Sequence, residues 1–262
     1  GHCFVLDGYN ADGLVHINWG WSGTSDGFYN IDLLNPTGFQ FETYQTMVTG
    51  IKSGNSNELI ELNVTTNGAG TLQQQIPEEK QYLVSRLTVS GNINSTDLKY
   101  LRRLAGRDEK GRSTRGQLAY VDLTGATIQA GGEPFIIDGT TQLTTRDNEL
   151  PERAFYDCEG LKTIKLPGSI KAVGNGAFAM CLALEELTMP ESGDNFVRDG
   201  DFILSKDRKA VVQVLPSATG RLDIPKGVTR INDYALAGCS KLTRLSVPST
   251  LESMGTRALY FD

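Results

Sequence analysis

An imidazole and a thiol stand next to each other at the start of the chain, as His2 and Cys3. Such a pair suggests thiol-dependent nucleophilic catalysis, which needs a thiolate, an imidazole within reach and a group that orients the imidazole. The apolar run Phe4-Val5-Leu6 predicts that both residues lead into a strand. Because neighbouring strand residues point to opposite faces, the Cys3 sulfur and the His2 ring would diverge. We therefore expect Cys3 to be a core residue rather than the nucleophile.

A second strand is expected beside the first. Residues Leu14 to Trp19 are predicted to pair with it through the loop Asn10-Ala11-Asp12-Gly13. Such a hairpin would carry a side chain from its second strand alongside His2, on rigid elements that hold the ring in place.

Several further motifs follow in order along the chain. They are Gly-His-x-Phe-Val-x-Asp-Gly at residues 1–8, His-x-Asn-Trp-Gly-Trp-x-Gly-x-Ser-Asp-Gly-Phe-Tyr at 16–29, Leu34-Asn35-Pro36, and Tyr44 to Lys52. With these motifs, Gly1 to about Lys52 resembles the C-terminal end of streptopain-family cysteine peptidases. The segment Thr37 to Thr43 departs from the family, which has a glycine-rich mobile loop there, so the behaviour of that loop is not carried over.

The resemblance implies three catalytic-site candidates. His2 matches the catalytic imidazole, Trp19 matches the indole that flanks it, and Asn18 occupies the neighbouring position, whose role the resemblance leaves open. His16 and Trp21 are expected to be structural. In papain-like enzymes the nucleophilic cysteine lies on the order of a hundred residues before the histidine. The chain is therefore interpreted as part of a secreted bacterial cysteine endopeptidase, inactive by itself because it lacks the nucleophilic cysteine.

Composition excludes several classes of function. The net charge of −6 argues against broad nucleic-acid or anionic-membrane binding, and no apolar run is long enough to span a membrane. The 29 glycines fit a turn-rich β protein. One basic stretch, Lys99 to Arg115, is interpreted as a solvated helix end and loop, with a binding patch as the alternative.

A pattern with a period of 23 residues occupies the C-terminal part of the chain, as from Ala154 to Ala177. Each unit has an alanine, an apolar residue, a cysteine three positions later and a short apolar strand ended by proline. Such a period is typical of a solenoid, whose units bury their apolar faces only by stacking. The pattern resembles the leucine-rich repeats of BspA-type bacterial surface proteins over about residues 150–262, with residues 196–220 as an inserted β-hairpin.

Three cysteines share one position of this repeat: Cys158, Cys181 and Cys239. We expect buried free thiols there, although adjacent coils could approach disulfide distance. The three lack the spacing of metal ligands, so no metal site is expected, and no cofactor is predicted.

The expected fold class is α+β, mostly β: a small antiparallel sheet remnant of a papain-like peptidase domain, followed by a leucine-rich-repeat solenoid. The expected domains are residues 1–53, a mixed strand and helix capping segment at 54–149, and the repeats at 150–262. Ser95 is predicted to cap a helix that runs through Leu104.

Two functions are compatible with this organisation. In the first, the repeats bind a protein ligand, such as a host or matrix protein, for a secreted or cell-surface peptidase. In the second, the chain is a non-enzymatic adhesin or binding module with a degenerate peptidase end. The N-terminal sheet is also expected to leave one apolar face uncovered, which predicts packing on the next segment or self-association.

Overall fold

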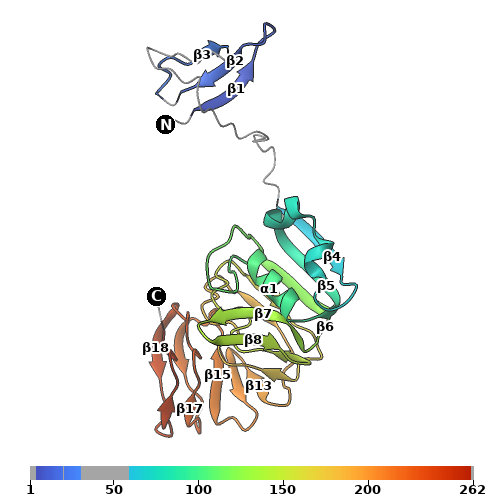
Figure 1. The fold of residues 1–262 in the computed structure, drawn as a ribbon. Helices are drawn as coiled ribbons and strands as arrows, with labels where there is room; N and C mark the ends of the chain where they lie inside the picture. The colour runs from blue at the N-terminus through green and yellow to red at the C-terminus, as the bar shows by residue number, and fades with distance from the viewer. Residues whose placement is uncertain (1–3, 20, 31–58, 261–262) are drawn as a thin grey trace. The chain divides into compact units, whose positions relative to one another are not determined.

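The structure is a computed structural model, and it describes residues 4–19, 21–30 and 59–260. The chain forms two compact units, residues 1–55 and 56–262 (Figure 1). Each unit has a hydrophobic core of its own. The predicted mostly β fold class is confirmed, since strands outnumber helices in the described residues of both units.

The first unit contains a three-stranded antiparallel sheet in the order β1-β2-β3. Its strands are β1 (Val5–Tyr9), β2 (Val15–Asn18) and β3 (Gly27–Tyr29). Asn10 shapes the loop between β1 and β2, because its Oδ1 accepts hydrogen bonds from the backbone N–H groups of Asp12 (3.1 Å) and Leu14 (3.0 Å). The first two strands thus form the hairpin that the sequence predicts.

The second unit is built on a five-stranded parallel sheet in the order β12-β10-β6-β5-β4. Its strands are β4 (Ile60–Thr65), β5 (Val84–Ile93), β6 (Tyr120–Ile128), β10 (Thr163–Lys165) and β12 (Glu186–Thr188). Buried and exposed residues alternate along them, as Arg86 and Leu87 do in β5. One face of the sheet therefore packs on the core and the other carries polar side chains.

Helix α1 (Ser95–Leu104) and two 3-10 helices, η2 (Leu72–Gln75) and η3 (Glu78–Leu83), belong to the N-terminal part of this unit. The sequence predicted Ser95 as the N-cap of α1, but the N-cap in the structure is Asn94. The Asn94 side chain accepts from the N–H of Thr96, and Asp97 accepts from the N–H of Asn94, both at 2.9 Å. Ser95 has another task, since its buried Oγ accepts from the N–H of Thr145 at 2.7 Å.

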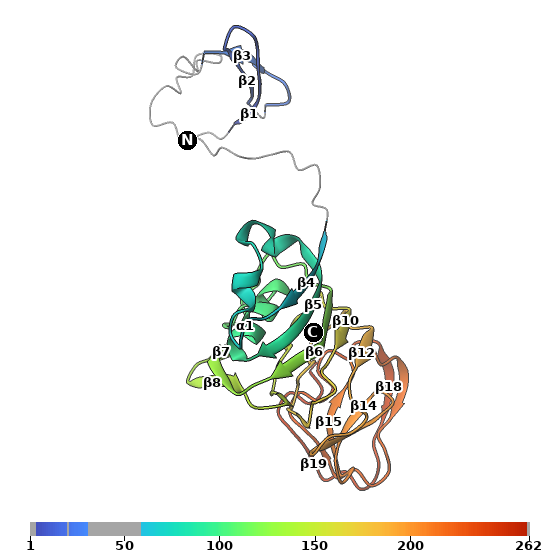
Figure 2. The ribbon, with the colours of Figure 1, turned by 90° about the vertical axis from the view of Figure 1, so that its right-hand side faces the viewer.

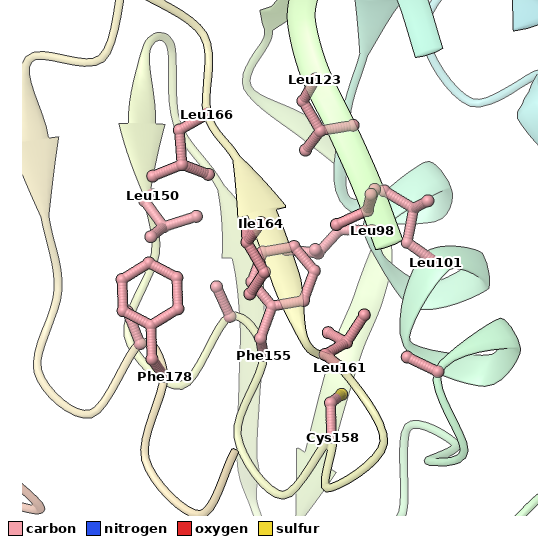
Figure 3. Packing of buried hydrophobic residues seen from close by; sticks show 14 of the residues in the cluster. Leu98, Leu101, Leu123, Leu150, Phe155, Cys158, Leu161, Ile164, Leu166 and Phe178 are labelled. Atoms are coloured by element: carbon pink, nitrogen blue, oxygen red, sulfur yellow. The ribbon is translucent and has the colours of Figure 1, made fainter. Parts of the chain in front are cut away.

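A hairpin of β7 (Gly131–Asp138) and β8 (Thr141–Thr145) lies beside α1 (Figure 1). Strand β6, which precedes this hairpin, lies beside the first repeat strand β10, and β10 lies beside β12 (Figure 2). Val121 of β6 stands opposite Ile164 of β10, and Ile164 stands opposite Leu187 of β12. Figure 3 shows Leu98 and Leu101 of α1 near Leu161 and Ile164 of the first repeat, within one continuous core. The capping segment and the repeats therefore form one body.

Two arginines of the basic stretch join α1 and the loop after it to the first repeat. Arg102 is buried, and its Nη1 donates to the carbonyls of Arg153 (3.3 Å), Ala154 (3.1 Å) and Tyr156 (3.0 Å). Arg107 pairs with Asp157 at 2.8 Å and with Glu159 at 2.5 Å. This part of the basic stretch is thus a structural joint, which corrects the interpretation as a solvated helix end.

A second row of short parallel strands follows the other side of the coils. It begins with β9 (Glu149–Leu150) and β11 (Ala172–Val173), which pair, and continues with β15 (Ala210–Val214), β17 (Arg230–Ile231) and β19 (Ser253–Met254). The strands β16 (Gly220–Asp223) and β18 (Leu242–Ser246) form a separate parallel pair. Two cores, one on each side of the insertion, fill these coils.

The turn of each repeat requires left-handed backbone at two positions. The residue before each repeat alanine has φ between 52° and 62°, and these residues are Arg153, Gly176, Tyr234 and Arg257. A second set precedes the repeat cysteines, with φ from 61° to 84°: Asp157, Met180 and Gly238. The turns also bond to one another, as Phe155 N–H does to Ala177 O at 2.8 Å.

The insertion differs in detail from the expected hairpin. The first part of the insertion is two strands and not one: a turn at Gly200 (φ 57°) separates β13 (Phe196–Asp199) from β14 (Phe202–Ser205), which pair with each other. The third strand, β15, pairs with β14 on one side and with the repeat strand β17 on the other. It therefore belongs to the solenoid as well as to the insertion.

The second row of strands is interrupted after β11, just before the insertion, and the side chain of Asn195 bonds to the free edge of β11. Its Oδ1 accepts from the N–H of Val173 at 3.0 Å, and its Nδ2 donates to the carbonyl of Val173 at 3.3 Å. It thereby replaces the backbone of a missing neighbouring strand. Among the described residues, no helix is long and apolar enough to cross a membrane.

Candidate functional site

The site predicted from the sequence is described in part. His2 and Cys3 lie outside the described residues. Asn18 is the last residue of β2 and stands opposite Val5 of β1. Trp19 follows it directly. The hairpin thus brings the beginning of β1 and the end of β2, with Asn18 and Trp19, to the same end of the sheet.

Trp19 is fully buried at the centre of an aromatic cluster. Its ring centroid lies 4.7 Å from that of Phe4, 5.7 Å from that of Trp21, with which it stacks, and 5.6 Å from that of Tyr29, which meets it edge-on. The backbone N–H of Trp19 donates to Asp26 Oδ1 at 2.9 Å. The indole is therefore held in one position, as a group that shields a reactive side chain must be.

Asn18 and Trp19 lie on opposite faces of the hairpin. Ile17 and Trp19 are fully buried, whereas Asn18 between them is exposed. Val5, the strand partner of Asn18, is also exposed, at 60%. The side chains of Asn18 and Trp19 therefore point away from each other, as neighbouring residues at the end of a strand do.

Two other residues of the segment have structural environments. The ring of His16 meets that of Phe28 edge-on, with centroids 5.0 Å apart, across the β2–β3 pair. Trp21 belongs to the aromatic cluster of Trp19. Asp26, which accepts from the N–H of Trp19, was not predicted as a residue of this site, although it lies in the Ser-Asp-Gly part of the matched motif.

The repeat cysteines are free and buried. Burial raises the pKa of Cys158 to about 11 and that of Cys239 to about 12, and it raises the pKa of Cys181 well above its usual range. The Cys181 thiol lies 3.0 Å from the Phe155 carbonyl, to which it donates. These thiols remain protonated near neutral pH, so they lack the thiolate that a nucleophile needs. The described residues contain no cluster of His, Cys, Asp and Glu that could hold a metal ion.

The two parts of the chain match two families. Residues 1–29 match the Peptidase C10 family, and residues 140–200 and 217–261 match the BspA type leucine-rich repeat region in six copies. The gap between the two repeat stretches falls within the insertion.

Curated relatives are similar to the N-terminal part. Streptopain of Streptococcus pyogenes is 46% identical over 59 residues, which cover 20% of this chain and 15% of that protein. The thiol protease/hemagglutinin PrtT of Porphyromonas gingivalis is 48% identical over 65 residues, which cover 22% of this chain and 7% of that protein. The chain thus spans only a small share of the length of either relative.

Solved structures with leucine-rich repeats are similar to the larger part of the chain. A leucine-rich cell surface protein from Faecalibacterium prausnitzii A2-165 has a TM-score of 0.40 and 18% identity, covering 67% of this chain and 42% of its own. A leucine-rich repeat protein from Eubacterium ventriosum has a TM-score of 0.43 and 16% identity, covering 76% and 58%. At these TM-scores the similarities do not locate a binding site.

The chain therefore combines a cysteine-peptidase segment with leucine-rich repeats in a mostly β fold. The segment is of the Peptidase C10, or streptopain, family, and the repeats are of the BspA type, as the sequence resemblance implied.

Proposed function

We propose that the N-terminal segment supplies the imidazole side of a cysteine endopeptidase site, with His2 as the acid–base group and Trp19 as its flanking indole. The observation that carries the proposal is the fixed, fully buried Trp19 at the end of β2, within the segment that matches Peptidase C10. His2 lies two positions before Phe4 in the sequence, and residues two apart on a strand point to the same face. The ring of Phe4 packs on Trp19. This placement favours Trp19 over Asn18 as the neighbour of the imidazole.

Asn18 receives a different role in this proposal. Its exposed side chain lies on the face away from the aromatic cluster, so its proposed effect on the imidazole is exerted through the backbone of β2. Asn18→Ala should therefore reduce activity less than Trp19→Ala in a protein that carries the complete site.

The nucleophile of this proposal is a cysteine outside the 262 residues. The chain has four cysteines; three are buried and protonated, and Cys3 has the opposite strand parity to His2. The matched segment covers 15% of streptopain, which leaves room in such a protein for the thiol. We expect the chain by itself to hydrolyse no peptide under reducing or oxidising conditions.

The gene provides the test. A reading frame that encodes a cysteine in a strand-to-helix context within about two hundred residues before Gly1 would support the proposal, and its absence would contradict it. A protein with that cysteine should cleave casein and lose the activity in His2→Ala, whereas His16→Ala should keep it. Hydrolysis by the 262-residue chain that His2→Ala abolishes would also contradict the proposal.

For the repeats we propose protein binding outside the cell, at the surface or after secretion. The polar face of the five-stranded sheet supports it, since Arg86 lies 3.9 Å from the Tyr120 ring centroid, and tyrosine and arginine are enriched in protein interfaces. Retention of binding to a host or matrix protein by residues 56–262, and its loss in Tyr120→Ala, would support this role.

A non-enzymatic adhesin is the second candidate. It is favoured by the size of the second unit, in which one core runs from the cap into the insertion and a second core fills the later coils. A protein with the upstream cysteine that binds a matrix protein but cleaves nothing would favour the adhesin over the peptidase.

The first unit is also proposed to pack on another surface. Val5, Tyr9 and Phe28 are 60%, 85% and 51% exposed on its small sheet. Concentration-dependent sedimentation of the full chain that Tyr9→Ser weakens would support self-association through this sheet.

A further inference from the structure

An open hollow of about 270 Å³ lies between α1 and the 3-10 helices η2 and η3 of the second unit. Its lining is mainly polar, with Gln73, Glu78, Gln81 and Tyr82 on the 3-10 side and Tyr100 and Arg103 on α1. The hollow is polar and open to solvent. It is distinct from the candidate peptidase site, which belongs to the other unit.

Arg103 is the cation of this lining. Several basic residues of the cap have a partner of their own: Lys99 pairs with Glu133, Arg112 with Asp108, and Arg115 lies over the Tyr82 ring. Within the described ranges, no carboxylate lies within ion-pair distance of Arg103, and its side chain is exposed. Its guanidinium therefore offers its donors to a ligand.

Tyr100 provides a second, independent sign of a ligand site. Its side chain is only 3% exposed, yet its hydroxyl makes no hydrogen bond to any residue that the structure describes. Burial, with the nearby Tyr82 phenol, raises the pKa of Tyr100 to about 12, against the opposing influence of Arg103. The ring is buried but the hydroxyl is not fully enclosed, so it opens on the hollow and stands there as a protonated donor.

The opposite wall is held in place by two contacts of Tyr82. The Arg115 guanidinium lies 4.8 Å from its ring centroid, and Gln117 Nε2 donates to its carbonyl at 3.0 Å. The hydroxyls of Tyr82 and Tyr100 therefore stand on two different elements, η3 and α1. Together with Arg103 they give the lining one positive charge and two neutral hydrogen-bond donors.

We propose that this hollow binds a sugar acid of monosaccharide size, with the carboxylate on Arg103 and the hydroxyls on Tyr82, Tyr100 and the glutamine amides. The guanidinium fork matches a carboxylate in two parallel hydrogen bonds. Phenols and amides both donate and accept, as sugar hydroxyls do. Glu78 accepts from a hydroxyl and repels a second negative charge, which selects a singly charged ligand over a phosphate. This site is independent of the proposed peptidase and protein-binding functions.

The test is a titration of the full 262-residue chain, followed by NMR or calorimetry, with glucuronate and galacturonate as probes and glucose as the neutral comparison. We expect saturable binding of at least one sugar acid with a Kd on the order of 1 mM, as for a single sugar in an open site. Glucose should bind about tenfold more weakly or worse, because it lacks the charge-assisted bonds.

Arg103→Gln should weaken sugar-acid binding about tenfold or more and reduce the preference over glucose. Tyr100→Phe keeps the ring and removes only the hydroxyl, so it should weaken the binding of both ligands while the fold is kept. Lys110→Gln is the matched control: it removes the same charge from the same basic stretch, outside the hollow, and should leave binding unchanged.

Three results would overturn the proposal. They are no saturable binding of either sugar acid, equal affinity for glucose and glucuronate, and an Arg103→Gln variant that is folded by circular dichroism and binds as the parent does. Equal losses in Arg103→Gln and Lys110→Gln would also overturn it, because they would indicate a general charge effect.

Discussion

Arg102 of α1 is 1% exposed, and its guanidinium lies against three carbonyls of the first repeat turn. Removing it would leave those carbonyls without their donor. We expect Arg102→Ala to lower the free energy of unfolding by about 3 kcal/mol in urea titrations of the full chain. Removal of a buried charged group has an effect of this size when its hydrogen-bond partners stay buried.

Arg146 is the matched control for this prediction. Its side chain is 81% exposed and its ion pair with Glu149 spans 3.8 Å. Arg146→Ala should change stability by less than about 0.5 kcal/mol. Similar losses in the two variants would mean that Arg102 does not join the cap to the repeats.

The buried thiols make the stability of the repeats depend on alkaline pH. Because burial raises the folded pKa of Cys158 to about 11 and that of Cys239 to about 12, the unfolded chain releases these protons at lower pH than the folded chain. Their contribution is fully present below the unfolded pKa, near 9, and is lost as pH rises through the folded values. We expect the free energy of unfolding to fall by roughly 4 kcal/mol between pH 9 and 11, by urea titration at each pH.

Tyrosine and lysine also titrate in this range, so a variant is needed to isolate the thiols. Cys239→Ala should be less stable than the parent at pH 7, because it leaves a small cavity, but it should lose less stability toward pH 11. An unchanged pH slope would exclude Cys239 as a source of the effect.

At the residue scale, strand alternation and the resemblance propose His2, Asn18 and Trp19 as site residues, and this assignment stays a prediction. The sequence correctly made the repeat cysteines buried and free, because they share one repeat position. The sequence did not predict the hollow of Arg103 and Tyr100. Arg102 and Arg103 are neighbours in one basic run, and nothing in that run indicates that the first is buried and the second faces the hollow.

The repeat turns impose a backbone that only some residues adopt without strain. Gly238 has φ of 84°, and a Cβ there would lie 2.8 Å from the Met180 Cα. Gly238→Ala should therefore combine left-handed strain with a clash against backbone, and destabilise the second unit by about 2–4 kcal/mol by thermal or urea unfolding.

Gly227 separates the two contributions. Its φ of 88° is similar, but the nearest atom to its Cβ position is Lys209 Nζ at 4.0 Å, the end of a flexible side chain. Gly227→Ala should show the strain alone, about 1–2 kcal/mol. Equal effects of the two substitutions would show that the turns of neighbouring coils do not pack closely.

At the element scale, strong periodicity was enough for the hairpin, α1 and the repeat strands. The left-handed positions escaped prediction because Arg153, Met180 and Tyr234 occupy them instead of glycine. The helix cap moved by one residue because both Asn94 and Ser95 are good caps, and only the tertiary bond of Ser95 to Thr145 decides between them.

At the scale of the whole molecule, both tryptophans, Trp19 and Trp21, belong to the first unit, whereas α1 belongs to the second. Three strands of five, four and three residues on a small core should be much less stable than the cap and repeats. We expect tryptophan fluorescence to change at lower urea concentration than helical circular dichroism does.

Superimposed transitions would contradict this expectation, because they would mean that the two units unfold cooperatively. Trp21→Phe serves as the control: it should reduce the fluorescence signal and leave the dichroism transition where it is. The division into units was predictable from the change of pattern after the peptidase motifs, but the fusion of cap and repeats into one body was not, since it depends on the β6–β10 pairing.

The paired hydrogen bonds of Asn195 to Val173 have a consequence for how such a chain can change over generations. A solenoid normally resists interruption, because any gap leaves backbone groups of the strand row unsatisfied. Here one amide side chain closes the row, and β15 starts it again. Between them, segments of varied length can be gained or lost while the coils on either side keep their own register, so this place is where related chains should differ most in length.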